Sequence, residues 1–242
     1  TEFLPGFISI EEITRLSGGS SNETWKILVR TKKKILNIIF RRTPGGNLKD
    51  KNSSNSVDIT DEAHVMTVAK KYNVPVPEIL KVINHKDIGK GFFMQFIEGE
   101  TLGNRIVNNE EFEKVRSMLA EKCGEIIANI HKIPISKFNN IRTSEAEEEL
   151  LRYEEVYKSH NQYIPVFEYT ISWLKDNLPK KIPLKLIHGD FRNGNLIISN
   201  EDLILVDDYT FFFIKDHIKE YNYLNISKNN KIIDVNCKFR NI

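Results

Sequence analysis

The stretch that decides the fold reads Leu186-Ile-His-Gly-Asp-Phe-Arg-Asn-Gly-Asn-Leu-Ile-Ile198, and Leu203-Ile-Leu-Val-Asp-Asp-Tyr209 follows it closely. Short apolar runs, which are typical of buried strands, bracket a polar loop that carries His188, Asp190 and Asn195. A further apolar run ends at Asp207 and Asp208. Because strands fix both ends of such a loop, we expect its acid and its amide to be held at one point of the molecule.

The spacing of the polar residues in this loop matches an arrangement used for phosphoryl transfer. In that arrangement an aspartate accepts the proton of the acceptor hydroxyl and an asparagine binds Mg²⁺, which predicts these roles for Asp190 and Asn195. A second metal ligand is expected at the end of the next strand, where both Asp207 and Asp208 qualify. The alternative is an ordinary turn whose Asp and Asn side chains bond to the backbone. The flanking apolar runs favour the catalytic interpretation.

The composition narrows the class of protein. The chain has 242 residues, enough for one large domain or two lobes, and its net charge of +2 gives no reason to expect nucleic acid as a partner. Cys123 and Cys237 are too far apart to suggest a metal site, and we expect Cys123 to be a buried thiol in a reducing compartment. Without a bilayer-spanning apolar run or a signal segment, the sequence predicts a cytoplasmic protein with no membrane contact. Because the sequence begins at Thr1 and not at a methionine, we expect a fragment.

The first part of the chain has the pattern of an antiparallel sheet. Strands are predicted at 13–16, 24–29 and 35–40, separated by a loop of small residues and by a charged turn. Backbone N–H groups of that loop are candidates to cover the phosphates of a nucleotide, and its members are Gly18, Gly19, Ser20, Ser21 and Asn22. A plain hairpin turn explains the loop equally well. It is not a P-loop, because the Gly-Lys-Ser/Thr ending is absent.

Further elements complete this first part. A loop is predicted at 44–56, and strands are predicted at 79–83 and 92–97. A helix is predicted at 60–72, with Asp58 or Thr60 as its cap and with Ala63, Met66 and Ala69 on its apolar face. Arg41, at a strand end, is a candidate to bind the α- and β-phosphates, and Glu62 on the helix is a candidate to orient it by a bidentate ion pair. Arg42 is the alternative cation. Without the loop motif, a surface arginine and a solvated glutamate would be as good an interpretation.

Beyond a break at 98–100, where we place the lobe boundary, the period of the apolar residues becomes helical. Helices are predicted at 112–131, 144–160 and 165–177. The first of them is expected to have one apolar face, which comprises Phe112, Val115, Leu119, Cys123, Ile126 and Ile130. The two later helices are expected to turn apolar residues inward: Leu150, Tyr153, Tyr157, Phe167, Ile171 and Leu174. His131 is better explained as a helix-end cation than as a functional residue. A β-rich first part and a helical second part predict an α+β protein with two lobes.

Taken together, the chain resembles the aminoglycoside phosphotransferase and choline kinase superfamily, whose hallmark is His-Gly-Asp with an asparagine five residues after the acid. It is most similar to the branch that includes the kinase-like domain fused to some acyl-CoA dehydrogenases. The resemblance extends from about Phe3 to Asp208. The motifs that carry it follow the order of that branch: Ser17-Gly-Gly-Ser-Ser-Asn22, Phe40-Arg-Arg-Thr-Pro44, Val74-Pro-Val-Pro77, Met94-Gln-Phe-Ile-Glu-Gly99, Trp173-Leu-Lys-Asp-Asn-Leu-Pro179 and His188-Gly-Asp-Phe-Arg-Asn-Gly-Asn-Leu196.

This resemblance implies a bilobal protein-kinase-like fold. Its N-lobe would be 1–98, an antiparallel sheet with one helix, and its mainly helical C-lobe 99–242, with the catalytic loop 188–195, the metal-binding segment 203–209 and an atypical tail 217–242. The resemblance also implies ATP and Mg²⁺ as cofactors and a small-molecule hydroxyl as acceptor; in this branch some acceptors are hydroxyacyl-CoA thioesters. Oligomeric state does not follow from it.

Residue by residue, Asp190 resembles the catalytic base and Asn195 a metal ligand. Arg41 stands where most relatives have a phosphate-binding lysine, an exchange common in this branch, and Glu62 stands at its helix partner. The backbone of the strand end that leads into the hinge would bind adenine, and it comprises Gln95, Phe96 and Ile97.

The end of the chain departs from the family pattern, which usually reads apolar-Asp-aromatic-Glu and later Gly-Asp-Pro. Here Thr210 replaces the glutamate, and Lys215-Asp-His217 stands in place of Gly-Asp-Pro. Alignment on Tyr209 and Asp216 selects Asp208 as the metal ligand, whereas counting from the strand selects Asp207. The tail lacks the helices that wall the acceptor site in relatives, which predicts an exposed apolar patch at Phe211-Phe-Phe-Ile214. A nucleotide-binding module or truncated fragment without turnover is therefore the alternative function.

Overall fold

The chain has an α+β fold of two lobes, as predicted. The computed structural model describes residues 3–16, 22–43, 58–141, 143–178, 184–200, 202–205 and 211–215. Within these residues no helix is both long enough and apolar enough to cross a bilayer.

The first lobe is built on a five-stranded antiparallel sheet with the order β1-β2-β3-β5-β4. Its strands are β1 (Phe7–Leu16), β2 (Glu23–Thr31), β3 (Ile35–Arg42), β4 (Ile79–His85) and β5 (Gly89–Gln95). The predicted strands are confirmed, although β1 begins earlier than expected and β5 ends at Gln95. The predicted loop at 44–56 lies outside the described residues.

Helix α1 (Ile59–Lys71) agrees with the helix predicted at 60–72. Asp58 caps it by accepting a hydrogen bond from the backbone N–H of Thr60 at 2.9 Å, and Lys90 on β5 lies 2.8 Å from the same carboxylate. The apolar face of α1 is buried, as expected for Ala63, Met66 and Ala69. The sequence pattern therefore predicted both the start of this helix and the face that it buries.

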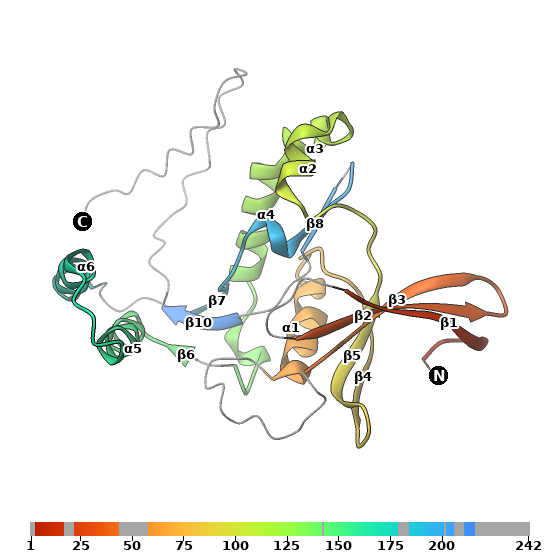
Figure 1. Ribbon diagram of the computed structural model, residues 1–242, viewed down its shortest axis with the longest axis horizontal. Coiled ribbons are helices and arrows are strands. Elements are labelled where there is room, and N and C mark those ends of the chain that lie inside the picture. Colours follow the sequence, from red (N-terminus) through yellow and green to blue (C-terminus); the bar gives the residue numbers. More distant parts are fainter. Residues whose placement is uncertain are drawn as a thin grey trace.

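Two hydrogen bonds attach α1 to the helical part of the chain. At the middle of α1, His64 Nε2 lies 3.0 Å from the carbonyl oxygen of Lys137 in η3 (Ile135–Lys137). Beyond its end, Asn129 of α4 (Leu119–His131) donates from Nδ2 to the carbonyl oxygen of Asn73 at 3.3 Å. One main hydrophobic core also runs from β3, β5 and α1 into α4 and the later strands. Figure 1 shows α1 and α4 between the sheet on one side and α5 and α6 on the other, with α2 and α3 at the upper end of α4.

The single helix predicted at 112–131 is wrong. The chain forms α2 (Gly103–Asn108), η2 (Glu110–Phe112), α3 (Glu113–Arg116) and then α4, with a turn at 117–118. Ser117 donates from its hydroxyl to the carbonyl oxygen of Lys114 at 2.7 Å, which offers the backbone an alternative to the helix. Arg116 bonds to two carbonyl oxygens at the end of α2, so α3 is held against α2. The helical spacing of apolar residues continues through the turn at 117–118, so the sequence pattern did not reveal this break.

The same residues show how far the predicted face was correct. Phe112, Val115, Ile126 and Ile130 are buried, whereas Cys123 is only half-buried and packs against the edge of the main core. Burial raises the pKa of the Cys123 thiol.

Helices α5 (Ala146–Ser159) and α6 (Pro165–Asp176) confirm the two later predicted helices but not all of their inward residues. Leu150 is buried, yet Tyr153 is 62% exposed and Phe167 is 49% exposed. A buried carboxylate joins the two helices: Glu154 on α5 lies 2.7 Å from Lys175 on α6. The ring of Phe167 still meets Tyr157 of α5 edge-on at 5.6 Å, so the amphipathic pattern was correct as a helix signal and wrong about the burial of Tyr153.

The remaining strands hold the quoted stretch. β7 (Leu184–His188) pairs with β10 (Phe211–Lys215), which pairs in parallel with β6 (Thr143–Ser144). β8 (Leu196–Ile198) and β9 (Leu203–Leu205) form a separate hairpin. The side chains of the apolar patch predicted at 211–214 lie outside the described part of the structure, as does the tail after residue 215.

Candidate active site

Arg41 and Glu62 form a buried ion pair between β3 and α1. Arg41 Nε lies 2.9 Å from Glu62 Oε1, and the two side chains are 8% and 3% exposed. Thr24 on β2 and Asn22 lie beside the pair, at 3.3 Å from Arg41 and 3.4 Å from Glu62. Two opposite charges that are both removed from water stabilise each other strongly in place, so Arg41 has a fixed position.

Successive side chains of β3 point to opposite faces of the sheet, so Arg41 and Arg42 lie on different sides of it. Arg42 turns to the other side of the strand, where its Nε lies 2.8 Å from Glu23 and its NH1 donates to the carbonyl oxygen of Ile88 at 3.1 Å. The structure therefore places Arg41, and not Arg42, against Glu62.

The predicted nucleotide hinge follows β5. Gln95 ends that strand and its N–H donates to the carbonyl oxygen of Glu78 at 2.9 Å. Lys26 Nζ lies 4.7 Å from the ring centroid of Phe96. Further on, Glu100 exchanges two backbone hydrogen bonds with Ile198, so the segment after the hinge crosses β8.

The predicted catalytic loop joins β7 to β8. Asn195, which is buried, ends the short helix η4 (Asn193–Asn195) and donates from Nδ2 to Asp190 twice: to the carbonyl oxygen at 2.7 Å and to the carboxylate Oδ2 at 3.0 Å. The N–H of Asp190 donates to Nδ1 of His188 at 3.2 Å, and Phe191 meets the His188 ring edge-on. The acid and the amide that were singled out five residues apart therefore lie in direct contact.

Arg192 is a part of this loop that the sequence interpretation missed. Its Nε donates to Asp190 Oδ2 at 2.8 Å, and the two side chains are 59% and 43% exposed. The hydrogen bond from Arg192, helped by that from Asn195, holds the pKa of the Asp190 carboxyl below its ordinary value despite partial burial. An arginine two residues after a predicted base was the available signal.

Several predicted site residues lie outside the part of the chain that the structure describes. Gly18, Gly19, Ser20 and Ser21, and both candidate metal acids Asp207 and Asp208, fall outside the described residues. Across the ranges that the structure does describe, His, Cys, Asp and Glu side chains form no group of three suited to a metal ion.

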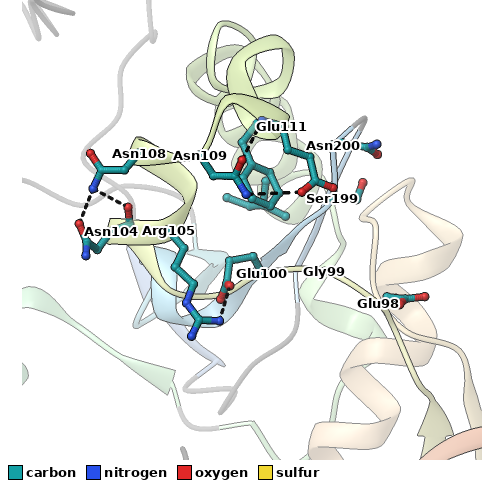
Figure 2. Close-up of a pocket in the computed structure, with 12 residues that line it drawn as sticks. Glu98, Gly99, Glu100, Asn104, Arg105, Asn108, Asn109, Glu111, Ser199 and Asn200 are labelled. Atoms are coloured by element: carbon teal, nitrogen blue, oxygen red, sulfur yellow. Dashed lines mark hydrogen bonds and ion pairs between the residues drawn. The ribbon is translucent and has the colours of Figure 1, made fainter.

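An open pocket of about 820 Å³ lies beside the segment that crosses β8, as Figure 2 shows. It is lined by residues of that segment, of α2 and η2, and of the β8–β9 turn: Glu98, Gly99, Glu100, Asn104, Arg105, Asn108, Asn109, Glu111, Phe112, Ile198, Ser199 and Asn200. None of the predicted site residues is among them. It adjoins the end of β8 that is opposite to Asn195.

Comparisons with known proteins give a consistent result. A model of the phosphotransferase enzyme family matches residues 12–209. Among curated proteins, Acyl-CoA dehydrogenase family member 10 of Mus musculus is 23% identical over 221 residues, which cover 88% of this chain and 20% of that protein. The chain therefore spans about a fifth of the length of this relative.

Solved structures share the fold. A candidate aminoglycoside phosphotransferase from Ralstonia eutropha JMP134 has a TM-score of 0.65 at 19% identity, covering 88% of this chain and 63% of that one. Aminoglycoside 2'-phosphotransferase-IIIa in complex with GDP has a TM-score of 0.62 at 16% identity, covering 85% and 69%. A choline/ethanolamine kinase family protein from Mesorhizobium loti has a TM-score of 0.55 at 18% identity, covering 84% and 60%.

Proposed function

Because this chain belongs to the phosphotransferase enzyme family, we propose that it transfers the γ-phosphoryl group of ATP to a hydroxyl of a small molecule. The observation that carries the proposal is the fixed carboxylate of Asp190, whose Oδ2 accepts hydrogen bonds from both Arg192 and Asn195. Positioning and electrostatics supply most of the catalysis in phosphoryl transfer, so an oriented carboxylate is the central requirement.

Asp190 acts as the base. Its Oδ1 takes no hydrogen bond from any described residue, which leaves that oxygen for the acceptor hydroxyl. As the acceptor oxygen bonds to the γ-phosphorus, the bond from that phosphorus to the bridging oxygen breaks and ADP leaves with its electron pair. The hydroxyl proton passes to Asp190.

Asn195 has the right atom to hold Mg²⁺. Both of the hydrogen bonds that the structure gives its amide use Nδ2, so Oδ1 remains for a cation that prefers oxygen ligands. Asp208, or Asp207 in its place, is proposed as the second ligand. Mg²⁺, when bound, supplies neutralisation of the phosphate charge.

Arg41 is proposed to bind the α- and β-phosphates while Glu62 keeps it in place. Its planar guanidinium offers several donors to phosphate oxygens, whereas a lysine offers a point charge. The loop Gly18, Gly19, Ser20, Ser21 and Asn22 is proposed to cover the phosphates. The hinge backbone of Gln95, Phe96 and Ile97 is proposed to bind the adenine.

The acceptor is proposed to be a hydroxyacyl-CoA. This is supported by the similarity to Acyl-CoA dehydrogenase family member 10, whose name refers to acyl-CoA substrates. Related folds have been solved with other small molecules, kanamycin in one case and spectinomycin in another.

The proposal is tested by combining a binding measurement with turnover. Mg·ATP should raise the melting temperature of the wild-type chain, and ATP should be consumed when a hydroxyacyl-CoA is added. Asp190→Ala should keep the nucleotide-induced shift and lose turnover. Stabilisation without turnover in the wild type would instead support the nucleotide-binding module, and equal turnover in the mutant would remove Asp190 from the role of base.

A further inference from the structure

Arg192 is placed at the point where an acceptor would meet the base. Its Nε is 2.8 Å from Asp190 Oδ2, on the same carboxylate whose other oxygen is proposed to receive the hydroxyl. Only one of the donors of its guanidinium is used in this contact, and no described residue bonds to NH1 or NH2. With a side chain that is 59% exposed, Arg192 can present these two nitrogens to a bound molecule.

The guanidinium of Arg192 lies in space that is left open by the missing side chain of Gly194. A Cβ atom at Gly194 would clash with NH1 of Arg192, so the guanidinium lies directly over the backbone of that glycine. Only a residue without a side chain allows this close approach. Arg192 and Gly194 therefore act together in fixing where the positive charge lies.

This charge changes what the carboxylate attracts. On its own, the negative charge of Asp190 would draw amino groups toward the acceptor site, but Arg192 offsets it from 2.8 Å away. The free NH1 and NH2 have the fork geometry that binds carboxylate and phosphate oxygens. An ammonium group near the acceptor hydroxyl would instead meet a like charge.

We propose that Arg192 makes the acceptor site select a hydroxyl that has a hydrogen-bond-accepting oxygen within a few bonds of it, a carboxylate most strongly and a thioester or amide carbonyl next, and reject amine-bearing acceptors. The proposal rests on the proposed function, because it takes Asp190 as the group that meets the acceptor hydroxyl. It deepens that function by naming the class of acceptor as hydroxy acids and their thioesters, not amino sugars.

The test uses three probes of nearly equal size that differ in charge: 3-hydroxybutanoate, 3-hydroxybutanamide and 4-amino-2-butanol. Their binding to the full chain saturated with Mg·ADP is measured by titration calorimetry or by NMR shifts. Wild type should bind the anion about tenfold or more tightly than the amine, with the amide between them, since a charge-assisted hydrogen bond is made only by the anion. Kanamycin should not bind at the same site.

Variants of Arg192 separate its charge from its size. Arg192→Gln should bring the three affinities within about threefold of one another, and Arg192→Glu should reverse their order. Gly194→Ala retains the arginine but displaces its guanidinium, so its preference should fall toward that of Arg192→Gln.

Two matched controls keep these results interpretable. Arg30 also bonds through Nε to an exposed carboxylate, Glu11, at 3.0 Å, but on the β1–β2 edge of the sheet. Arg30→Gln should leave the preference unchanged. Gly124→Ala places a methyl group on α4 where nothing lies within 4 Å, and it should also leave the preference unchanged.

The outcomes distinguish this inference from the proposed function. If Mg·ADP stabilises the chain and ATP is consumed, but the amine binds as well as the anion or Arg192→Gln keeps the preference, the selection by Arg192 is wrong and the kinase proposal stands. If no probe binds to the Mg·ADP complex, the selection is also wrong. If Mg·ADP itself fails to stabilise the chain, the kinase proposal fails.

Discussion

Asn195 holds Asp190 at two points, its main-chain carbonyl at 2.7 Å and its carboxylate at 3.0 Å, through a single amide nitrogen. One buried side chain thus fixes both the path of the catalytic loop and the direction of its acid. Arg192 of the same loop also donates to this carboxylate oxygen, so two donors restrain the position of Asp190.

Removing this amide should affect catalysis and the fold together. Asn195→Ala is expected to lower the turnover rate by about a hundredfold or more, since it removes the side-chain oxygen that is proposed to hold Mg²⁺. It should also lower the free energy of unfolding by about 1–2 kcal/mol because the buried hydrogen bonds are lost. Steady-state kinetics and urea titration measure the two effects. Asn193→Ala, an exposed residue of the same short helix, is the control and should change neither by much.

The buried ion pair should be costly to break from one side. Glu62→Ala leaves the charge of Arg41 buried without its carboxylate and should lower the free energy of unfolding by about 3 kcal/mol or more. Urea unfolding monitored by circular dichroism measures this. Glu11→Ala, which breaks the exposed pair with Arg30, is the control and should have little effect.

A paired replacement separates stability from function. Arg41→Met combined with Glu62→Leu removes both charges and should recover most of the lost stability. If Arg41 binds phosphates, the same double variant should still fail to bind Mg·ATP. Normal nucleotide affinity in this variant would show that the pair is only structural.

The close crossing over β8 predicts a glycine requirement at one position. A Cβ at Gly99 would lie 2.8 Å from the carbonyl oxygen of Ile198 and 2.5 Å from the side chain of Ile197. Gly99→Ala should therefore lower the free energy of unfolding by about 1–3 kcal/mol through overpacking. Gly124→Ala, in open space on α4, should instead be neutral or raise it by up to about 1 kcal/mol. Equal effects would contradict the close crossing.

The cap of α1 predicts a pH dependence of stability. Burial raises the pKa of Asp58, but the hydrogen bonds from Lys90 and Thr60 outweigh it, so the pKa lies below the ordinary value of 3.8. A carboxyl with a depressed pKa in the folded state stabilises the fold above its unfolded pKa and loses that contribution as the pH falls through its folded pKa. Stability should thus decline below about pH 4, and Asp58→Asn should show a smaller decline over that range. A parallel decline in both proteins, measured by urea titration, would contradict this assignment.

Local patterns in the sequence predicted the elements that depend on local causes. The cap at Asp58 and the spacing of Ala63, Met66 and Ala69 were enough to place α1 within one residue at each end. Likewise, the apolar runs around 188–195 predicted that strands hold the loop, and β7 and β8 do so.

What the sequence could not predict depends on contacts between distant segments. The exposure of Tyr153 and Phe167 depends on which surface faces each helix, and an amphipathic period carries no such information. The pairing of β10 with β6 and β7 joins segments that are far apart in the chain. Arg192 was missed because its role depends on folding back over Gly194, which spacing alone does not encode.

The hydrogen bonds that His64 and Asn73 make with η3 and α4 limit how the sheet and the helices can move relative to each other. His64 of α1 and Asn73 just beyond it bond to the helical half, whereas Asp58 at the start of α1 is paired with Lys90 of β5 at 2.8 Å, so α1 is tied to both halves. Any change in the angle between the sheet and the helices must then strain contacts of α1 with one half or the other. The buried contact between Arg41 on β3 and Glu62 on α1 is one of these contacts, so this ion pair should resist a tilt of the sheet relative to α1.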